Sequence, residues 1–292
     1  MKIILAQPRG FCAGVDRAIK MLEQALEFYG VPIYARHAIV HNRHVIKSFE
    51  ERGVIFVEDL REIPKGATVV FSAHGVSPAI RKKAEERSLK IIDATCPLVA
   101  KVHREVKRYS REGYTVLLVG HKNHVEVIGT RGEASENVVV IETVEDAQRV
   151  AAPDSSKVAY ATQTTLSVDD TQAIIDVLKN RFPNIEGPSK PDICYATQNR
   201  QEAIKKLAQV SEVIFIVGSD ISSNSNRLKE IAEACGVKAY LIENADDIKP
   251  EMFSDNMKVG VSSGASTPEF LVREALKKLQ EFTTIDFLNE IW

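Results

Sequence analysis

The sequence lacks the short motifs that mark common nucleotide and metal sites. It has no C-x-x-C pair, so a zinc ribbon and thioredoxin-like chemistry both lack their local signal. It has neither a G-x-x-x-x-G-K-[ST] loop nor a G-x-G-x-x-G run, so a standard cradle for ATP or GTP and a standard Rossmann site for NAD are not indicated. Any chemistry must therefore be assembled from residues far apart in the chain.

Strong net charge and long apolar runs are also missing. The chain has 38 Lys and Arg against 40 Asp and Glu, a formal charge of -2, which gives no field to attract nucleic acid or an anionic membrane. No apolar run approaches the roughly 20 residues of a membrane span, and IILA at the start is too short for a secretory signal. We expect a cytoplasmic protein that binds neither nucleic acid nor membrane, in a compartment where disulfides are rare.

The 292 residues alternate between two kinds of segment. Short apolar runs such as 68–72, 116–119 and 214–217 are typical of buried strands. Amphipathic stretches such as 16–30 and 98–113 are typical of helices. This alternation predicts βαβ units and a mostly parallel α/β fold, in which ligands bind at polar loops after the strands.

The alternation repeats three times when the chain is aligned on its cysteines. Cys12, Cys96 and Cys194 are each followed by a predicted helix, a predicted strand and a polar loop that begins 28 or 29 residues later. The loops contain His41, His124 and the run Ser222, Ser223 and Asn224, and a second loop in each third contains His74, Thr164 or Ser266. We interpret the chain as three similar α/β modules of about 90 residues, although ordinary βα units could recur this way by chance.

The predicted modules cover 1–95, 96–192 and 193–292, the last with a C-terminal tail, and the N-terminal strand is a candidate to pair with the third module. Arranged about a pseudo-threefold axis, the modules would direct three thiolates into one central cavity. A helix N-terminus stabilises a thiolate, which is the form that binds metal. Three cysteines rather than four leave one metal position open, as in catalytic sites.

The alternative for these three cysteines is burial without a task. We assign that simpler role to Cys235, which precedes Gly236 and does not occupy the repeated position, so it is predicted to be a small buried apolar residue.

Neutral hydrogen-bond donors dominate the polar loops. They are His41, His74, His124, Thr164, Ser222, Ser223, Asn224 and Ser266. Such donors at strand ends and helix N-termini suit phosphate, and histidine can add positive charge. Alternatively, the serine cluster only caps a helix.

Glu126 lies two residues after His124, and an extended backbone would direct both side chains to the same side. A carboxyl there is a candidate proton donor. The alternative is an exposed glutamate at a strand end.

Nine segments together resemble one enzyme family. They are FCAGVDRAI, RHAIVHN, FSAHGVSP, DATCPLV, GHKNHVEVIGT, TQTTLSVDDT, DICYATQNRQ, GSDISSNSNRL and SSGAS. In order, they are similar to the 4-hydroxy-3-methylbut-2-enyl diphosphate reductases, iron–sulfur enzymes that complete the non-mevalonate isoprenoid pathway. The resemblance implies a [4Fe–4S] cluster held by Cys12, Cys96 and Cys194. It implies diphosphate binding by seven of the donor residues, all except Thr164, which also belongs to the substrate site. It also implies that Glu126 donates a proton with help from Thr164, beside Thr165.

The implied reaction is a reductive dehydroxylation that yields isopentenyl and dimethylallyl diphosphate. In this family, the iron without a cysteine ligand binds the substrate alcohol, and electrons come from an external one-electron donor of the ferredoxin or flavodoxin type. The chain departs from the family pattern at Val125, where proline is frequent, at Ala38, where glutamate is frequent, and at Asp220-Ile221, where Lys-Asn is frequent. Proline would fix φ, so Val125 could loosen the segment that directs Glu126.

Two other functions fit the same residues. An iron–sulfur sensor could use the open metal position to detect oxygen or a phosphorylated metabolite, and it would show no turnover. A zinc hydrolase with cysteine ligands would be colourless.

Overall fold

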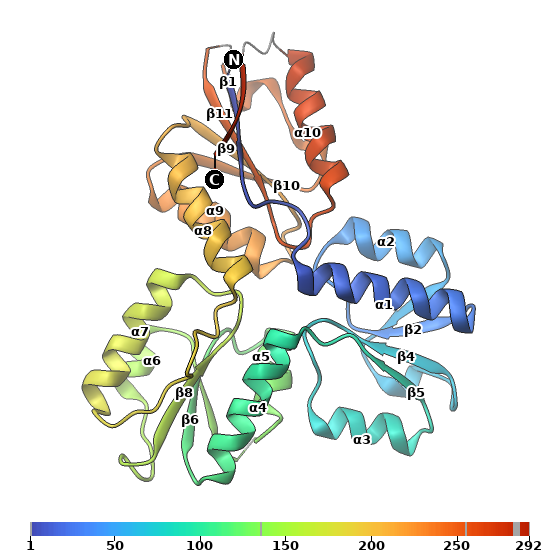
Figure 1. Cartoon of the computed structure of the whole chain (residues 1–292), viewed down its shortest axis with the longest axis vertical. Helices are drawn as coiled ribbons and strands as arrows, with labels where there is room; N and C mark the ends of the chain where they lie inside the picture. Colours follow the sequence, from blue (N-terminus) through green and yellow to red (C-terminus); the bar gives the residue numbers. More distant parts are fainter. Residues whose placement is uncertain (1, 135, 255, 283–286, 292) are drawn as a thin grey trace. The chain divides into compact units, whose positions relative to one another are not determined.

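The computed structural model describes residues 2–134, 136–254, 256–282 and 287–291. Its strands form three parallel sheets (Figure 1), so the predicted α/β fold with three small parallel sheets is confirmed. The order in the first sheet is β10-β9-β11-β1-β12, in the second β3-β2-β4-β5, and in the third β7-β6-β8. The boundaries of three modules and their arrangement about an axis stay predictions.

The strands are short, and each sheet collects segments that are distant in the chain. The first sheet contains β1 (Lys2–Ala6), β9 (Val213–Val217), β10 (Lys238–Ile242), β11 (Lys258–Ser263) and β12 (Phe287–Ile291). The second contains β2 (Ile33–Arg36), β3 (Val54–Val57), β4 (Thr68–Phe71) and β5 (Lys90–Asp93). The third contains β6 (Thr115–Val119), β7 (Val138–Ile141) and β8 (Val158–Thr162).

Helices connect most of these strands, as parallel pairing requires. They are α1 (Ala13–Tyr29), α2 (Arg43–Glu51), α3 (Pro78–Glu86), α4 (Pro97–Arg111), α5 (Val125–Arg131), α6 (Val144–Arg149), α7 (Val168–Arg181), α8 (Tyr195–Ala208), α9 (Ser223–Ala234) and α10 (Glu269–Phe282). Three short 3-10 helices cover Leu60–Glu62, Ala245–Asp247 and Pro250–Met252. No helix in the described ranges is long and apolar enough to span a bilayer.

The chain folds as two compact units. One consists of Met1–Val15, His41–Val45 and Tyr195–Trp292, and the other of Asp16–Val40 and Ile46–Cys194. In the first unit, Phe215 and Leu271 belong to a core that lies against the first sheet. In the second unit, Phe71 and Leu117 belong to separate cores, each within its own sheet layer. Every residue of β9 is buried, as expected for a parallel strand covered on both faces.

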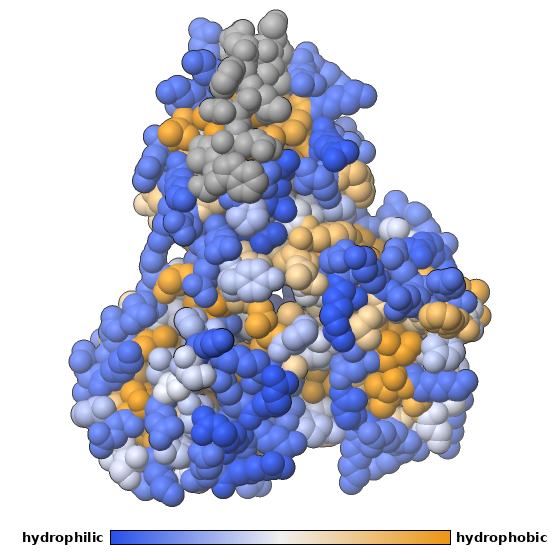
Figure 2. Space-filling model, viewed as in Figure 1, coloured by the Kyte–Doolittle hydropathy of each residue, from blue (hydrophilic) through white to orange (hydrophobic). Residues whose placement is uncertain are grey.

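Hydrophilic residues dominate the face that Figure 2 displays, and apolar residues reach it only in small groups. Strand β2 ends at Arg36, because the next residue, His37, has a φ of 61°, which ends extended structure.

Candidate functional site

Three cysteines share one local backbone arrangement, in three separate parts of the chain. They are Cys12, Cys96 and Cys194. Each directly precedes a helix, α1, α4 or α8 respectively. Each cysteine N–H donates to a carbonyl oxygen in a strand-end loop. The three bonds run from Cys12 to Ala265 (3.0 Å), from Cys96 to Ala73 (2.9 Å) and from Cys194 to Thr164 (3.1 Å). In all three cases the acceptor is the second residue after the strand, so the repeat read from the sequence is also a repeat of hydrogen bonding.

Sheet pairing explains why the three positions match. The chain segment that leads to each cysteine lies beside the strand whose loop accepts the bond. Thus β1 pairs with β11, β5 pairs with β4, and Glu186 forms a bridge with Ala159 of β8. Parallel neighbours end at the same edge of a sheet, so the cysteine comes next to the neighbouring loop.

None of the four cysteines forms a disulfide, and the three repeated ones are half-buried. Half-buried cysteine sulfurs are soft ligands of the kind that zinc, copper(I) and iron–sulfur clusters take. Cysteine sulfurs match the ligand chemistry of an iron–sulfur cluster, although no group of three or more His, Cys, Asp or Glu side chains among the described residues forms a site that could hold a metal ion. The prediction for Cys235 is wrong, because it is exposed. It caps the C-terminus of α9 before Gly236, whose φ is 82°, and the helix ends at the surface instead of continuing into a core.

Glu126 is buried and is bonded to Thr164 through both carboxylate oxygens. Its exposed fraction is 2%. The Thr164 N–H donates to Oε1 at 2.7 Å, and the Thr164 hydroxyl donates to Oε2 at 2.9 Å. Burial raises the pKa of Glu126 from 4.5 to about 7, although the bonds from Thr164 favour the charged form and act against that rise. A carboxyl with this pKa is protonated in a large fraction of molecules near neutral pH, as a proton donor must be.

The expected extended backbone between His124 and Glu126 is wrong, and so is the exposed strand-end alternative. His124 is the N-cap of α5, and its Nδ1 accepts the Glu126 N–H at 3.2 Å. Val127 packs into the core and pulls this first helical turn into the interior. Because Nδ1 accepts, the proton of the neutral imidazole is assigned to Nε2.

A second histidine lies beside His124. The His74 ring packs edge-on against it, with centroids 5.9 Å apart and an interplanar angle of 83°. Its Nδ1 lies 3.2 Å from the hydroxyl of Ser72, in the loop after β4. The second unit therefore contains Cys96, Cys194, Glu126, Thr164 and this histidine pair. Thr165, the neighbour that the resemblance added, accepts from the side chain of Gln163 at 3.0 Å.

The other predicted donors lie in the first unit. The Ser266 hydroxyl donates to the His41 carbonyl at 2.9 Å, which joins two of the polar loops. Ser222 is the N-cap of α9 and accepts the Ser225 N–H at 3.2 Å, so the capping interpretation holds for that residue. Ser223 is the first residue of the helix.

Capping does not account for Asn224. Its side chain is 5% exposed, and neither its amide nitrogen nor its amide oxygen has a hydrogen-bond partner within the described residues. Buried amides are normally satisfied, so this side chain is available to a ligand.

The structure explains how the chain accommodates two of its departures from the family pattern. Val125 is the first residue of α5, where the N–H needs no helical partner and where most residues adopt the required φ. Asp220 pairs with Arg43, which also binds Glu243 at 2.5 Å, so the acidic substitution is neutralised within its own unit. Nothing in the structure explains Ala38.

Sequence reasoning missed several buried polar contacts near these residues. His103 is 8% exposed, and its Nδ1 lies 3.0 Å from a carboxylate oxygen of Glu133. Asp192, two residues before Cys194, accepts from Lys101 at 2.7 Å and from the Thr162 N–H at 2.9 Å. Burial raises the pKa of Asp192 to about 6, while Lys101 acts in the opposite direction. These partners are 30 to 91 residues apart, and no local pattern marks them.

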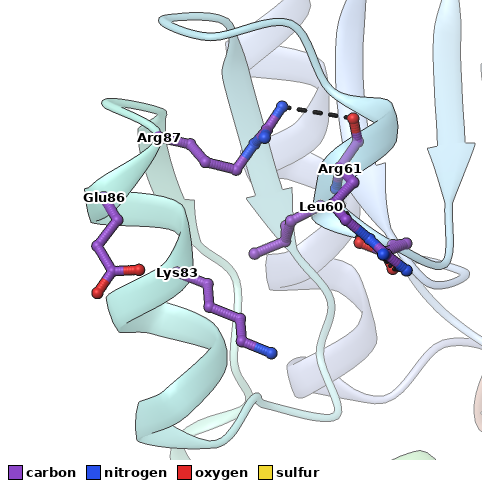
Figure 3. A pocket seen from close by; sticks show the side chains of 6 residues that line it. Leu60, Arg61, Lys83, Glu86 and Arg87 are labelled. Atoms are coloured by element: carbon purple, nitrogen blue, oxygen red, sulfur yellow. Dashed lines mark hydrogen bonds and ion pairs between the residues drawn. The ribbon is translucent and has the colours of Figure 1, made fainter.

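A surface pocket of about 390 Å³ (Figure 3) contains none of the predicted site residues. It is lined by Asp59, Leu60, Arg61, Lys83, Glu86 and Arg87. Arg61 binds Asp59, and Arg87 donates to the Ile63 carbonyl at 2.5 Å and to the Arg61 carbonyl at 3.4 Å. Two of its cations are thus bound to protein groups, and we assign the pocket no chemistry.

The chain is similar to known proteins over almost its whole length. The LytB protein family matches residues 3–280. A 4-hydroxy-3-methylbut-2-enyl diphosphate reductase of Haemophilus influenzae (strain PittGG) is 53% identical over 285 residues, which cover 97% of this chain and 91% of that protein. The same-named protein of Hahella chejuensis (strain KCTC 2396) is 54% identical over 285 residues, with 96% and 90% covered.

Two solved structures are also similar. The E-1-hydroxy-2-methyl-but-2-enyl-4-diphosphate reductase of Plasmodium falciparum has a TM-score of 0.96 and 42% identity, covering 99% of this chain and 91% of that chain. A structure of (E)-4-hydroxy-3-methyl-but-2-enyl diphosphate reductase has a TM-score of 0.68 and 35% identity, covering 96% and 100%.

Proposed function

The chain belongs to the LytB family of 4-hydroxy-3-methylbut-2-enyl diphosphate reductases, and we propose that it converts 4-hydroxy-3-methylbut-2-enyl diphosphate into isopentenyl and dimethylallyl diphosphate. The observation that carries the proposal is the buried Glu126 carboxyl with a pKa of about 7. Hydroxide is a poor leaving group, so a reductive dehydroxylation needs a proton near neutral pH. Glu126 supplies that proton, and its two bonds from Thr164 hold the carboxyl in one orientation.

Cys12, Cys96 and Cys194 are proposed as the ligands of a [4Fe–4S] cluster. Their shared backbone position, reduced state and partial burial support this role. Once bound, the cluster supplies electrons one at a time and a Lewis acid at the iron that has no cysteine ligand.

The substrate diphosphate is proposed to bind the neutral donors His41, His74, His124, Ser222, Ser223, Asn224 and Ser266. Asn224 offers an amide whose nitrogen and oxygen bind no described protein group. His124 is proposed to donate through Nε2, because its Nδ1 accepts the Glu126 N–H. These groups hold the diphosphate in place, which orients the alcohol end of the substrate.

Electrons are proposed to come from an external one-electron donor such as a ferredoxin or flavodoxin, since the sequence has no standard dinucleotide motif. The cytoplasmic location also stays a prediction.

Anaerobic purification followed by an assay with dithionite and substrate tests the proposal. We expect brown protein and formation of both products. Colourless zinc-containing protein would favour the hydrolase, and a stable cluster without turnover would favour the sensor. Either outcome would refute the proposed reaction.

A further inference from the structure

A basic residue recurs at a similar position in each helix that follows a repeated cysteine. Arg17 of α1 lies five residues after Cys12, Lys101 of α4 five residues after Cys96, and Arg200 of α8 six residues after Cys194. We call these three side chains the loop-binding cations. Basic residues are frequent in helices, so their recurrence alone is not evidence of a shared role. The evidence is the set of groups that these three side chains contact.

Each loop-binding cation donates to a backbone carbonyl in the segment just before another of the three repeated cysteines. Arg17 Nη1 donates to Thr95 at 3.0 Å, one residue before Cys96. Lys101 Nζ donates to Lys190 at 2.7 Å, four residues before Cys194. Arg200 Nη2 donates to Gly10 at 2.7 Å, two residues before Cys12. Each contact thus runs within one unit, from a helix that follows one repeated cysteine to the segment that precedes another.

The contacts differ in burial. Arg200 is 3% exposed, and its Nη1 also donates to the Ala196 carbonyl of its own helix at 2.8 Å. Lys101 also binds Asp192, whose side chain is 0% exposed and whose other oxygen accepts the Thr162 N–H. Charge-assisted bonds of this kind are strong when water is excluded. The bonds that Arg17 and Lys101 donate to the loop carbonyls are both exposed and therefore weaker than the Arg200 bond.

We infer that Arg17, Lys101 and Arg200 are positioning residues, each of which fixes the loop that leads to another of the three repeated cysteines. Each accepting carbonyl lies in the short segment that leads to a cysteine. A cation held on a helix restricts the motion of that segment. The cysteine N–H bond to a strand-end loop fixes one side of each segment, and the cation fixes the other. Positioning for cluster binding rests on the proposed function, whereas the restriction of the loops does not.

The test is native-state hydrogen exchange on the full chain, purified anaerobically and resolved to short peptides. For Arg200→Gln we expect exchange about tenfold faster in the segment around Cys12, a factor that corresponds to about 1.4 kcal/mol. For Lys101→Met the same rise is expected around Cys194, because this variant also leaves the buried Asp192 carboxylate without its cation. For Arg17→Gln the rise around Cys96 should stay within about threefold, because that contact is exposed. In each variant, the cysteine that precedes the altered helix should keep its protection.

Matched controls remove a cation from the same helices without touching a cysteine loop. Three variants serve: Lys20→Met in α1, Arg108→Gln in α4 and Lys206→Met in α8. Each breaks an ion pair with an acidic residue four positions away. These controls should leave exchange unchanged. If Arg200→Gln does not fold, Arg200→Lys replaces it as the test variant. Its hydrogen exchange is expected to be about threefold faster around Cys12 and unchanged elsewhere. Unchanged or uniformly raised exchange in these variants would overturn the inference.

Iron release to a chelator and turnover separate this inference from the proposed reaction. Arg200→Gln should release iron about tenfold faster than the unaltered protein, while Lys206→Met should not. Segment-specific exchange in a chain that lacks reductase turnover would refute the reaction and keep the positioning role. Normal turnover without segment-specific exchange would support the proposed reaction and refute the positioning role.

Discussion

Replacing Glu126 by glutamine tests the central acid through activity and stability together. Glutamine has nearly the same shape and can still accept the Thr164 N–H bond, but it cannot donate a carboxylic proton. We expect turnover to fall by about 10²-fold or more. The unaltered enzyme should lose kcat/KM as pH rises through about 7, since its proton donor becomes ionised there. That pH limb should disappear in Glu126→Gln.

The same pKa predicts a gain in stability. In the folded chain the pKa of Glu126 is about 7 against an ordinary 4.5, a difference worth about 3 kcal/mol. The unfolded chain ionises first, so the free energy of unfolding decreases by that amount as pH rises from below 4.5 to above 7. The glutamine of Glu126→Gln cannot ionise, so the variant does not show this decrease in the free energy of unfolding. Denaturant titrations at pH 6 and 8.5 should show the variant more stable at both, with an advantage about 1 kcal/mol larger at the higher pH.

Glu112→Gln is the matched control, because Glu112 is an exposed partner of Arg108. Its unfolding free energy should change by less than about 0.5 kcal/mol, with full turnover. Near-normal turnover of Glu126→Gln would contradict the assignment as proton donor. Equal stability of that variant and the unaltered protein at both pH values would contradict the burial argument.

Three further predictions concern the other residues. Cys12→Ser, Cys96→Ser and Cys194→Ser should each lose iron and colour in anaerobic preparations, whereas Cys235→Ser should keep both. Retained iron in any of the first three would remove that residue from the ligand set. Thr164→Val deletes the hydroxyl bond to Glu126, which favours the charged carboxylate; the alkaline limb of the kcat/KM profile should move up by about one pH unit, and an unmoved limb would exclude this coupling. Asn224→Leu removes the unsatisfied buried amide, so KM should rise about tenfold while chain stability stays the same or increases; lower stability with normal KM would indicate a structural amide.

The local pattern of apolar and polar residues was sufficient to predict the fold class. Apolar runs of strand length alternate with amphipathic stretches, and this periodicity depends only on how side chains alternate along a backbone. It therefore predicted the parallel α/β sheets. The position of Cys12, Cys96 and Cys194 at helix starts was likewise readable, because each cysteine directly precedes a helical pattern.

Tertiary structure decided what surrounds those residues. Nothing in GHKNHVEVIGT marks Glu126 as buried, because burial depends on the core that receives Val127 and on the Thr164 loop 38 residues away. The same holds for Cys235, which has an apolar neighbourhood in sequence but lies exposed at a helix end. The carbonyl contacts of Arg17, Lys101 and Arg200 join residues 78 to 190 positions apart. Periodicity reports on a single segment, whereas hydrogen-bond partners and pKa values depend on which segments the folded chain brings together.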